Sequence, residues 1–444
     1  MKPFVVVIFA IFVGGWLASN ATAQSSDQLQ KMRSIRRGMR PPIELDSQKI
    51  DARGIAKSQS RHLTLLTDVR GREDIAEFCK VFDSAVGQWC DYFEVSKKRV
   101  EPWHLRGMVI ADRERFDQAG LLPDDLPDFL AGYQQGHEMW VYLQPGQYYS
   151  RHLLLHEGTH SFMQWFLGGT GAAWYSEGMA ELLGVHSWNG EELEMNFQLA
   201  DRSQAPYWGR VKLVQENCRD GNAMSLDDVF AIPGSAFREV RYYAWSWAAC
   251  HFFSQHPRTK PIFRKLKNVA SKSPTVFNAA WERWIHEFRP ELDRDWELFV
   301  HEIEFGYDFA AGVISPAEEN GSTVNVKSDS SWQLTSIAVK PGETFAFKAD
   351  GQYTIATEGS TTWTCEAGGI TIDYYAGHPL GQLMVAVLPE NAREPGLLLE
   401  KKPVGTRRDI SFDQTGRLAF RINESPAKMS DNEGKLTLKY KKLK

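Results

Sequence analysis

The sequence predicts an α+β domain followed by an all-β sandwich. Up to about residue 305, short apolar runs typical of strands alternate with longer segments whose apolar residues recur every three or four positions, as on one face of a helix. Beyond a Ser-Pro and acidic passage at 315–320, the pattern changes to short alternating segments that end at Gly, Asn or Asp. One helix of the first part carries histidines at metal-binding spacing.

Residues 1–23 are expected to be a secretory signal peptide. Lys2 precedes an apolar run at 4–17, and the small residues before Gln24 form a cleavage site. A membrane anchor is the alternative, but the apolar run is short for a span. Residues 24–58 are polar and basic, so we expect a flexible lead-in or a pro-segment. The protein is therefore expected to be secreted or periplasmic.

Composition narrows the range of partners. The net charge is −5 and no long basic tract is present, which argues against nucleic acid. After signal cleavage, no remaining segment is long and apolar enough to span a membrane. Five cysteines are too few for a disulfide framework in this length of chain. Cys79 and Cys90 lie about three turns apart on one expected helix, too far to pair.

The first folded domain is expected over residues 59–312, in the order strand, helix, strand, strand, helix. Its strands are predicted at 62–66, 105–111 and 138–143, and its helices at 72–94 and 150–166. A Gly-rich loop at 168–171 then leads into a mainly helical region. The helices expected there are 175–186, 208–217, 241–255, 259–269, 275–287 and 290–304. Residues 313–321 are expected to be a linker, and 322–444 the sandwich.

The helix at 150–166 contains the motif H-E-x-x-H, from His156 to His160. Residues four apart stack on one helical face, so His156 and His160 can bind one metal ion. Glu157 is one position further round and can reach a water bound to that ion, as a general base. The alternative is a buried helix whose two histidines are satisfied by ordinary hydrogen bonds.

A catalytic zinc ion needs a third protein ligand and an open position for water. Glu177 is the candidate, on a second helix that the Gly-rich loop turns antiparallel to the first. Glu181 is one turn further on the same face, where a carboxylate can accept a hydrogen bond from the outer N–H of a ligand histidine. The alternative is a solvated acidic face. Apolar neighbours such as Met179 and Leu182 argue for burial instead, where unpaired carboxylates are costly.

H-E-x-x-H followed by W-x-x-E-G-x-A-E, which begins at Trp174, resembles the gluzincin clan of peptidase-MA-like metallopeptidases. The resemblance implies a zincin-like domain with a mixed sheet and a helical subdomain. It implies zinc ligands His156, His160 and Glu177, with Glu157 as the base and Glu181 supporting a ligand. Phe166 stands where metzincins have a third histidine, so that class is excluded.

The resemblance also bears on the substrate. The Gly-Ala/Gly-Met-Glu-Asn run of aminopeptidases is absent, and Trp140-Val141-Tyr142 occupies that edge-strand position, which argues against an aminopeptidase. A peptide or protein substrate is expected to pair with the strand at 138–143 by β-addition. Similar domains supply an oxyanion donor from a later helix. The candidates are Tyr242 and Tyr243, of which we favour Tyr243; the alternative is an aromatic core position.

Short segments at 332–337, 339–342, 381–383, 416–418 and 421–424 are followed by Asp431-Asn432-Glu433-Gly434. With these segments, the C-terminal sandwich resembles the jelly-roll of the soluble galactose-binding lectins of bacteria. In that family, paired Asn and Asp residues hold a Ca²⁺ ion that chelates sugar hydroxyls. The matching positions here are Glu424, Asp431 and Asn432, whose oxygen atoms suit calcium. The alternative is a sandwich without a ligand, in which Asp431-Asn432-Glu433-Gly434 is a turn.

The leading hypothesis is a secreted zinc metallopeptidase with an accessory β-sandwich, for which carbohydrate binding and a sandwich without a ligand are both left open. One alternative is a glycan-binding or adhesion protein whose zincin domain is catalytically idle. Another is a zinc hydrolase that acts on a non-peptide amide. The presence of both histidines together with Glu157, Glu177 and Glu181 favours an active hydrolase, because an idle site would tolerate loss of the base.

Overall fold

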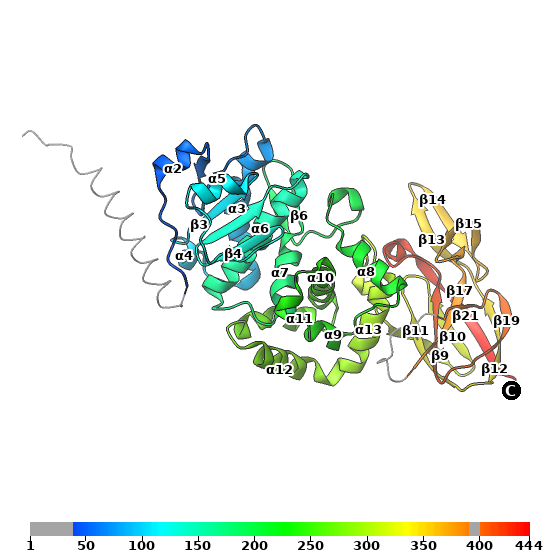
Figure 1. Cartoon of the computed structure of the whole chain (residues 1–444). Coiled ribbons are helices and arrows are strands. Elements are labelled where there is room, and N and C mark those ends of the chain that lie inside the picture. Colours follow the sequence, from blue (N-terminus) through cyan, green and yellow to red (C-terminus); the bar gives the residue numbers. More distant parts are fainter. Residues whose placement is uncertain (1–38, 390–399) are drawn as a thin grey trace, which may run out of the picture. The chain divides into compact units, whose positions relative to one another are not determined.

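The computed structural model describes residues 39–389 and 400–444 (Figure 1). The expected signal peptide at 1–23 and the first part of the expected lead-in lie outside these residues. The chain divides into two compact units. Of the described residues, the first unit contains 39–145 and 153–161, and the second contains 146–152, 162–389 and 400–444. Helices and several sheets are both present, which confirms the α+β class.

A five-stranded sheet forms the first unit, in the order β1-β2-β3-β5-β4. The strands are β1 (Ala56–Gln59), β2 (Leu63–Thr67), β3 (Leu105–Ile110), β5 (Glu138–Tyr142) and β4 (Gly132–Gln135). The three central strands are parallel, and the two edge strands are antiparallel to their neighbours. We expected the strand at 138–143 to be the edge that accepts a peptide. This was wrong, because β5 is paired on both sides and β4 is the edge.

Helix α3 (Glu73–Phe93) matches the predicted 72–94 and turns its apolar face to the interior. Two residues of the expected flexible lead-in, Ile50 and Ile55, are buried in a core with Leu66, Met108 and Trp140. That part of the lead-in also contains α2 (Ser47–Ala52) and β1. The expectation of a flexible segment up to residue 58 was therefore wrong for the residues that the structure describes. The remaining helices of the unit are α4 (Lys97–Val100) and α5 (Arg113–Gln118).

Helix α6 (Gln147–Phe166) contributes its middle to the first unit and its ends to the second. The second unit begins with a helical region whose central pair is α7 (Ala173–Gly184) and α10 (Val240–Gln255). Gly178 allows this close approach, since a Cβ there would overlap the Ser246 carbonyl. The other elements are β6 (His186–Trp188), β7 (Leu193–Met195), α8 (Arg210–Arg219), α9 (Leu226–Phe230), α11 (Lys260–Phe263), α12 (Pro274–Ile285), α13 (Arg289–Glu302) and α14 (Phe309–Gly312).

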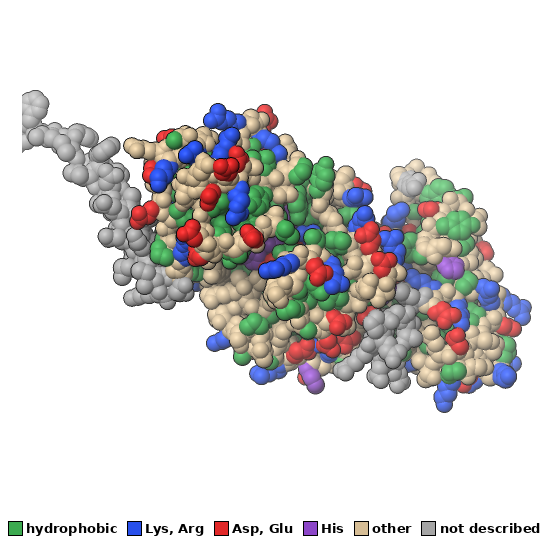
Figure 2. Space-filling model, viewed as in Figure 1, with side chains coloured by type: hydrophobic (Ala, Val, Ile, Leu, Met, Phe, Trp, Pro, Cys, Tyr) green, Lys and Arg blue, Asp and Glu red, His purple; other side chains and the backbone are tan. Residues whose placement is uncertain are grey.

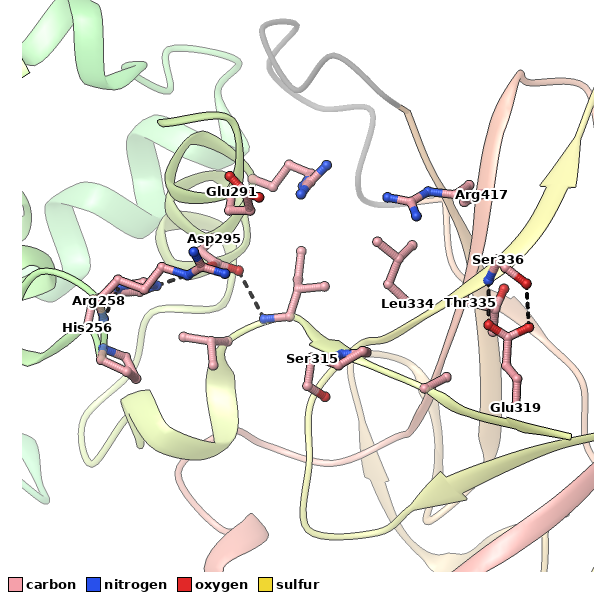
Figure 3. Close-up of a pocket in the computed structure, with 16 residues that line it drawn as sticks. His256, Arg258, Glu291, Asp295, Ser315, Glu319, Leu334, Thr335, Ser336 and Arg417 are labelled. Atoms are coloured by element: carbon pink, nitrogen blue, oxygen red, sulfur yellow. Dashed lines mark hydrogen bonds and ion pairs between the residues drawn. The ribbon is translucent and has the colours of Figure 1, made fainter. Parts of the chain in front are cut away.

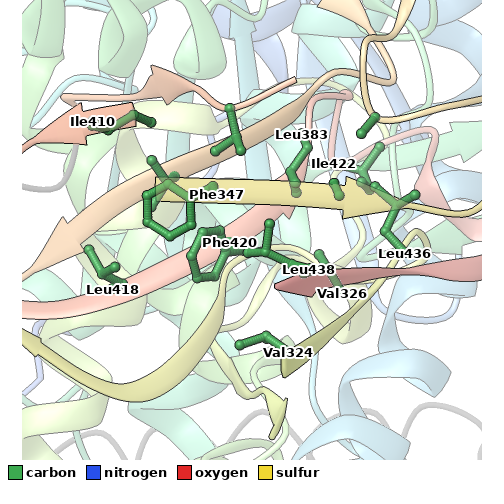
Figure 4. Packing of buried hydrophobic residues seen from close by; sticks show 14 of the residues in the cluster. Val324, Val326, Phe347, Leu383, Ile410, Leu418, Phe420, Ile422, Leu436 and Leu438 are labelled. Carbon is green, nitrogen blue, oxygen red and sulfur yellow. The ribbon is translucent and has the colours of Figure 1, made fainter. Parts of the chain in front are cut away.

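Two sheets of the second unit form the β-sandwich that the sequence predicts. One has seven strands and contains β12, β21 and β10; the other has the order β18-β17-β20-β11-β8. Side chains from both sheets, such as Phe347 and Phe420, fill the space between them (Figure 4). The strands are β8 (Ser315–Pro316), β9 (Glu318–Asn320), β10 (Thr323–Lys327), β11 (Gln333–Val339), β12 (Thr344–Asp350), β13 (Tyr353–Glu358), β14 (Thr361–Cys365), β15 (Ile370–Tyr375), β16 (His378–Leu380), β17 (Leu383–Leu388), β18 (Lys402–Pro403), β19 (Arg407–Ser411), β20 (Gly416–Ile422) and β21 (Glu433–Lys442).

The sandwich is joined to the helical region by α13. Leu298 packs against Met384 and other residues of the outer face of the second sheet. Both Glu302 carboxylate oxygens lie 2.7 Å from Nη1 of Arg421, in the buried interior of the unit. The expected linker at 313–321 contains β8 and β9, which are paired with sandwich strands.

Charged side chains of both signs are interspersed on the face shown in Figure 2. Among the helices of residues 39–389 and 400–444, none is both long and apolar enough to cross a membrane. All five cysteines are free thiols.

Candidate metal centre

The two histidines of the motif lie side by side in the middle of α6. Nε2 of His156 is 3.2 Å from Nε2 of His160, and their rings are 4.8 Å apart at 78°. His156 is buried and His160 half-buried. Two nitrogens, each about 2.05 Å from a tetrahedral zinc ion, are about 3.3 Å apart. The spacing of the two Nε2 atoms therefore fits a shared metal ion.

Helix α3 supports this part of α6 through Trp89. A Cβ at Gly158 would lie 2.6 Å from Trp89 Cη2 and 2.9 Å from Phe82 Cε2, so only glycine leaves room for the two rings. The Trp89 indole N–H donates to the hydroxyl of Thr159 at 3.0 Å, and that hydroxyl donates to the Leu155 carbonyl at 2.8 Å. The two residues between Glu157 and His160 thus fix the rotation of the helix about its axis.

Glu157 faces the edge strand of the first sheet. Its side chain is 5 % exposed, and a Cβ at Gly132 on β4 would overlap the carboxylate. Burial, together with the charge of Glu157, raises the pKa of the Tyr133 phenol on the same strand. The carboxylate therefore lies directly beside an edge strand, and glycine at 132 is what permits this approach.

Glu177 comes from α7, one helix after the motif. His156, His160 and Glu177 each offer one ligand atom, and these three atoms lie within 4.8 Å of one another. The structure thus brings together the three residues that the sequence selects. One carboxylate and two imidazoles with the observed nitrogen spacing fit a zinc ion. Their role as metal ligands stays a prediction.

Glu181 is 1 % exposed and has strong partners of its own. Arg210 donates to both carboxylate oxygens at 2.9 Å, and the Trp208 indole N–H donates to one of them at 3.2 Å. Nε2 of His152 is 3.3 Å from the same oxygen. Residues His152, His156 and Glu181 form a second group with ligand atoms within 4.8 Å. Support of a ligand histidine by Glu181 remains a prediction.

Arg210, Trp208 and Gly132 were missed in the sequence analysis. Arg210 lies at the start of α8, in a segment with no metal-site motif, and its partner Glu181 is 29 residues earlier. The only local signal was Trp208-Gly209-Arg210, where a cation stands beside a large apolar residue at a helix start. Gly132 lies on a short, half-buried strand without apolar alternation, so nothing in the sequence marked it.

Tyr243, the expected oxyanion donor, lies in the first turn of α10 and is half-buried. Its hydroxyl donates to the Phe237 carbonyl at 3.1 Å. Its ring lies 5.8 Å from the Arg210 guanidinium carbon, so it contacts the cation that holds Glu181. Tyr242, the other candidate, accepts a hydrogen bond from Arg241 at 2.8 Å. The oxyanion role of Tyr243 stays a prediction.

The three calcium candidates of the sandwich are only partly brought together. The Asn432 amide donates to the Glu424 carboxylate at 2.7 Å and to the Ser328 carbonyl at 2.9 Å. The Asp431 carboxylate instead accepts from the backbone N–H of Thr357 at 3.0 Å. Burial raises the pKa of Glu424 to about 7, which disfavours the charged form that calcium needs. Calcium binding therefore stays a prediction for this site.

Comparison with known proteins adds little. No protein-family model matches the chain. No curated protein matches it either. A solved structure described as "EclA N-terminal domain; PllA-like lectin" matches at 18% identity and a TM-score of 0.22, over 28% of this chain and 97% of that chain. The assignment of the metal centre therefore depends on the residues of this chain and on their geometry.

Proposed function

We propose that this chain is a secreted zinc-dependent metallopeptidase of the gluzincin type, with a zincin-like catalytic domain. The observation that carries the proposal is the group His156, His160 and Glu177, whose ligand atoms lie within 4.8 Å of one another beside Glu157. His156, His160 and Glu177 would hold a zinc ion, which would polarise a carbonyl group and lower the pKa of a bound water to about 7.

The chain's own residues supply the proton transfers. Glu157 accepts the proton of the attacking water and returns it to the leaving amine, as a general base and then a general acid. Tyr243 is the proposed donor to the oxyanion, for which its hydroxyl must leave the Phe237 carbonyl that it bonds in this structure. Arg210 holds the Glu181 carboxylate with two hydrogen bonds, which fixes this carboxylate next to His152.

We propose that an extended peptide binds along β4, the edge strand next to Glu157. Among the strands that the structure describes, β4 pairs with β5 alone, so its other edge can add a strand through main-chain hydrogen bonds. Gly132 brings this strand against the Glu157 carboxylate, which places the bound main chain near the base. The lack of an aminopeptidase motif favours cleavage within a peptide rather than at its amino terminus.

Metal analysis and cleavage of a peptide library test the proposal, with wild type and Glu157→Gln compared. We expect one zinc ion per chain in both proteins, and cleavage that falls by about a hundredfold or more in the variant. If zinc is bound and wild type cuts no peptide, the peptidase assignment fails. A catalytically idle zincin domain on a glycan-binding protein is then the better assignment.

Carbohydrate binding by the sandwich is a separate proposal, with Glu424, Asp431 and Asn432 as candidate calcium ligands. It is supported by the contact between Asn432 and Glu424, and by the Asn432 side-chain oxygen, which is buried without a hydrogen bond. A glycan array probed with the full chain, with and without EDTA, is the test. Calcium-dependent binding supports the proposal, and the lack of any calcium-dependent signal refutes it.

A further inference from the structure

A cavity of about 500 Å³ lies in the second unit between α13 and the sandwich (Figure 3). The loop after α10 and one side of α13 form one wall. Strands β8 and β11 and the start of β20 form the other. Its volume is in the range of cavities that bind small molecules. None of the residues assigned above to the metal centre or to the calcium site lines it.

Two of the three carboxylates that line this cavity are already bonded. Asp295 lies 3.0 Å from the His256 ring and accepts the backbone N–H of Ile314 at 3.0 Å. Glu319 accepts the backbone N–H and the hydroxyl of Ser336, at 2.6 and 2.8 Å. Both interactions are drawn in Figure 3. Glu291 is the remaining carboxylate of the lining.

Three arginines line the same cavity: Arg258, Arg294 and Arg417. Within residues 39–389 and 400–444, none of them forms an ion pair with a carboxylate. Nε of Arg294 is buried and has no hydrogen-bond partner. Arg417 extends from the sandwich toward the helix that carries Glu291 and Asp295 (Figure 3). Guanidinium groups stay charged at all ordinary pH values, so the lining has three cations and one carboxylate that is not otherwise bonded.

A buried guanidinium N–H without an acceptor is unfavourable, and an oxyanion is the partner that satisfies it best. The three cations come from three separate elements, so one small oxyanion is not expected to meet all of them. Apolar side chains such as Leu334 and Ile314 provide a surface for the carbon skeleton of a ligand. The required ligand is therefore small, and it has more than one anionic group.

We propose that this cavity binds a small molecule that carries at least two carboxylate, phosphate or sulfate groups. Arg294 and Arg417 are its main contacts, one from α13 and one from β20. Such a ligand bridges the helical region and the sandwich, so it stabilises the folded second unit. The site is independent of the proposed peptidase centre.

The test measures the melting temperature and calorimetric affinity of the full secreted chain with three probes: citrate, pyrophosphate and a sulfated uronic-acid disaccharide. The variants are the double change Arg294→Gln/Arg417→Gln, the exposed Arg258→Gln, and Arg407→Gln as a control. Arg407 lies on β19, is exposed and does not line the cavity. The probe that binds identifies carboxylate, phosphate or sulfate as the preferred group.

We expect at least one probe to bind wild type, Arg407→Gln and Glu157→Gln alike, with an affinity that falls as salt is raised. The double variant should bind at least about tenfold more weakly, since each charge-assisted hydrogen bond is worth about that factor. If the double variant does not fold, the single change Arg417→Gln is measured in its place, and it should also weaken binding by about tenfold. The proposal is overturned if no probe binds wild type, or if the affinity is unchanged by loss of these arginines.

Discussion

Arg210 donates two hydrogen bonds to Glu181, from Nε and Nη2 to the two carboxylate oxygens, both at 2.9 Å. Both side chains are buried, and the pair lies next to His152 and Trp208. A planar guanidinium matches a carboxylate in this geometry, whereas an ammonium group does not. The Glu181 carboxylate is thus held by a cation that no sequence motif identified.

Replacing Arg210 by Met should be strongly destabilising, because it leaves the Glu181 charge buried without its partner. We expect a loss of about 3–5 kcal/mol in the free energy of unfolding, together with weaker zinc binding. Chemical denaturation and zinc titration measure the two effects. Lys212→Gln on the same helix is the matched control, since its pair with Glu216 is exposed and is worth about 1 kcal/mol at most. Equal stability of the two variants would contradict this account.

Gly158→Ala tests the packing of α3 against the motif helix. The new methyl group meets Trp89 and Phe82, so we expect a loss of about 1–3 kcal/mol and a disturbed histidine pair. Gly87→Ala is the control: Gly87 lies within α3, has no atom within 4 Å of an added Cβ, and should gain about 0.5–1 kcal/mol from helix propensity. Chemical denaturation gives the free energy of unfolding of the two variants. If this free energy changed in the same direction in both, the packing argument would be refuted.

Gly132→Ala should impair the base without removing the metal. A Cβ at this position overlaps the Glu157 carboxylate, which must then move away from its place beside β4. We expect zinc content to stay near that of wild type, while kcat falls about tenfold or more toward the level of Glu157→Gln. Steady-state kinetics with a cleaved peptide give the answer. Unchanged kcat would mean that β4 does not constrain the base.

The parts of the fold that the sequence predicted correctly are those with a local signal. The helix at 72–94 is α3 at Glu73–Phe93, because its apolar side chains recur on one face, and the sandwich followed from alternating segments. β4 was missed because it has four residues and no apolar alternation, and its neighbour β5 was taken as the edge in its place. The pairing of Arg210 with Glu181 depends on how two helices meet, which local periodicity does not encode.

Acid should destabilise the second unit through its buried histidines. Burial lowers the pKa of His186 to about 3 and that of His251 to about 4. Both take up protons more readily in the unfolded chain, where the pKa is about 6.5. The stability that each contributes is therefore complete above about pH 6.5 and is lost as the pH falls toward about 4 or 3, by about 1.4 kcal/mol per pH unit for each group. Burial raises the pKa of Glu297 and of Glu424 to about 7, so these two carboxyl groups contribute slopes of the opposite sign in the same range. Denaturation between pH 7 and pH 4.5 must therefore compare wild type with a variant that lacks one histidine.

His251→Phe isolates one of these groups. The His251 ring lies 5.2 Å from Trp247 and 5.0 Å from Phe309, so another aromatic ring can replace it. We expect the free energy of unfolding to depend less steeply on pH in the variant, because its unfolding takes up about one proton fewer. An unchanged slope would show that His251 does not titrate in this range.

Two overlapping groups of candidate ligands predict different effects of substitutions on zinc affinity. His156 belongs to both, with His160 and Glu177 in one and with His152 and Glu181 in the other. Glu181 already accepts from Arg210 and Trp208, and a cation so close repels a metal ion. Glu177→Gln should therefore weaken zinc binding by about a hundredfold or more, whereas Glu157→Gln, which alters no ligand, should retain it. Competition with a chelator measures both affinities, and zinc should raise the melting temperature of each protein that binds it.

If Glu177→Gln retains the wild-type affinity and His152→Ala loses it, the metal lies in the second group and the proposed active site is wrong.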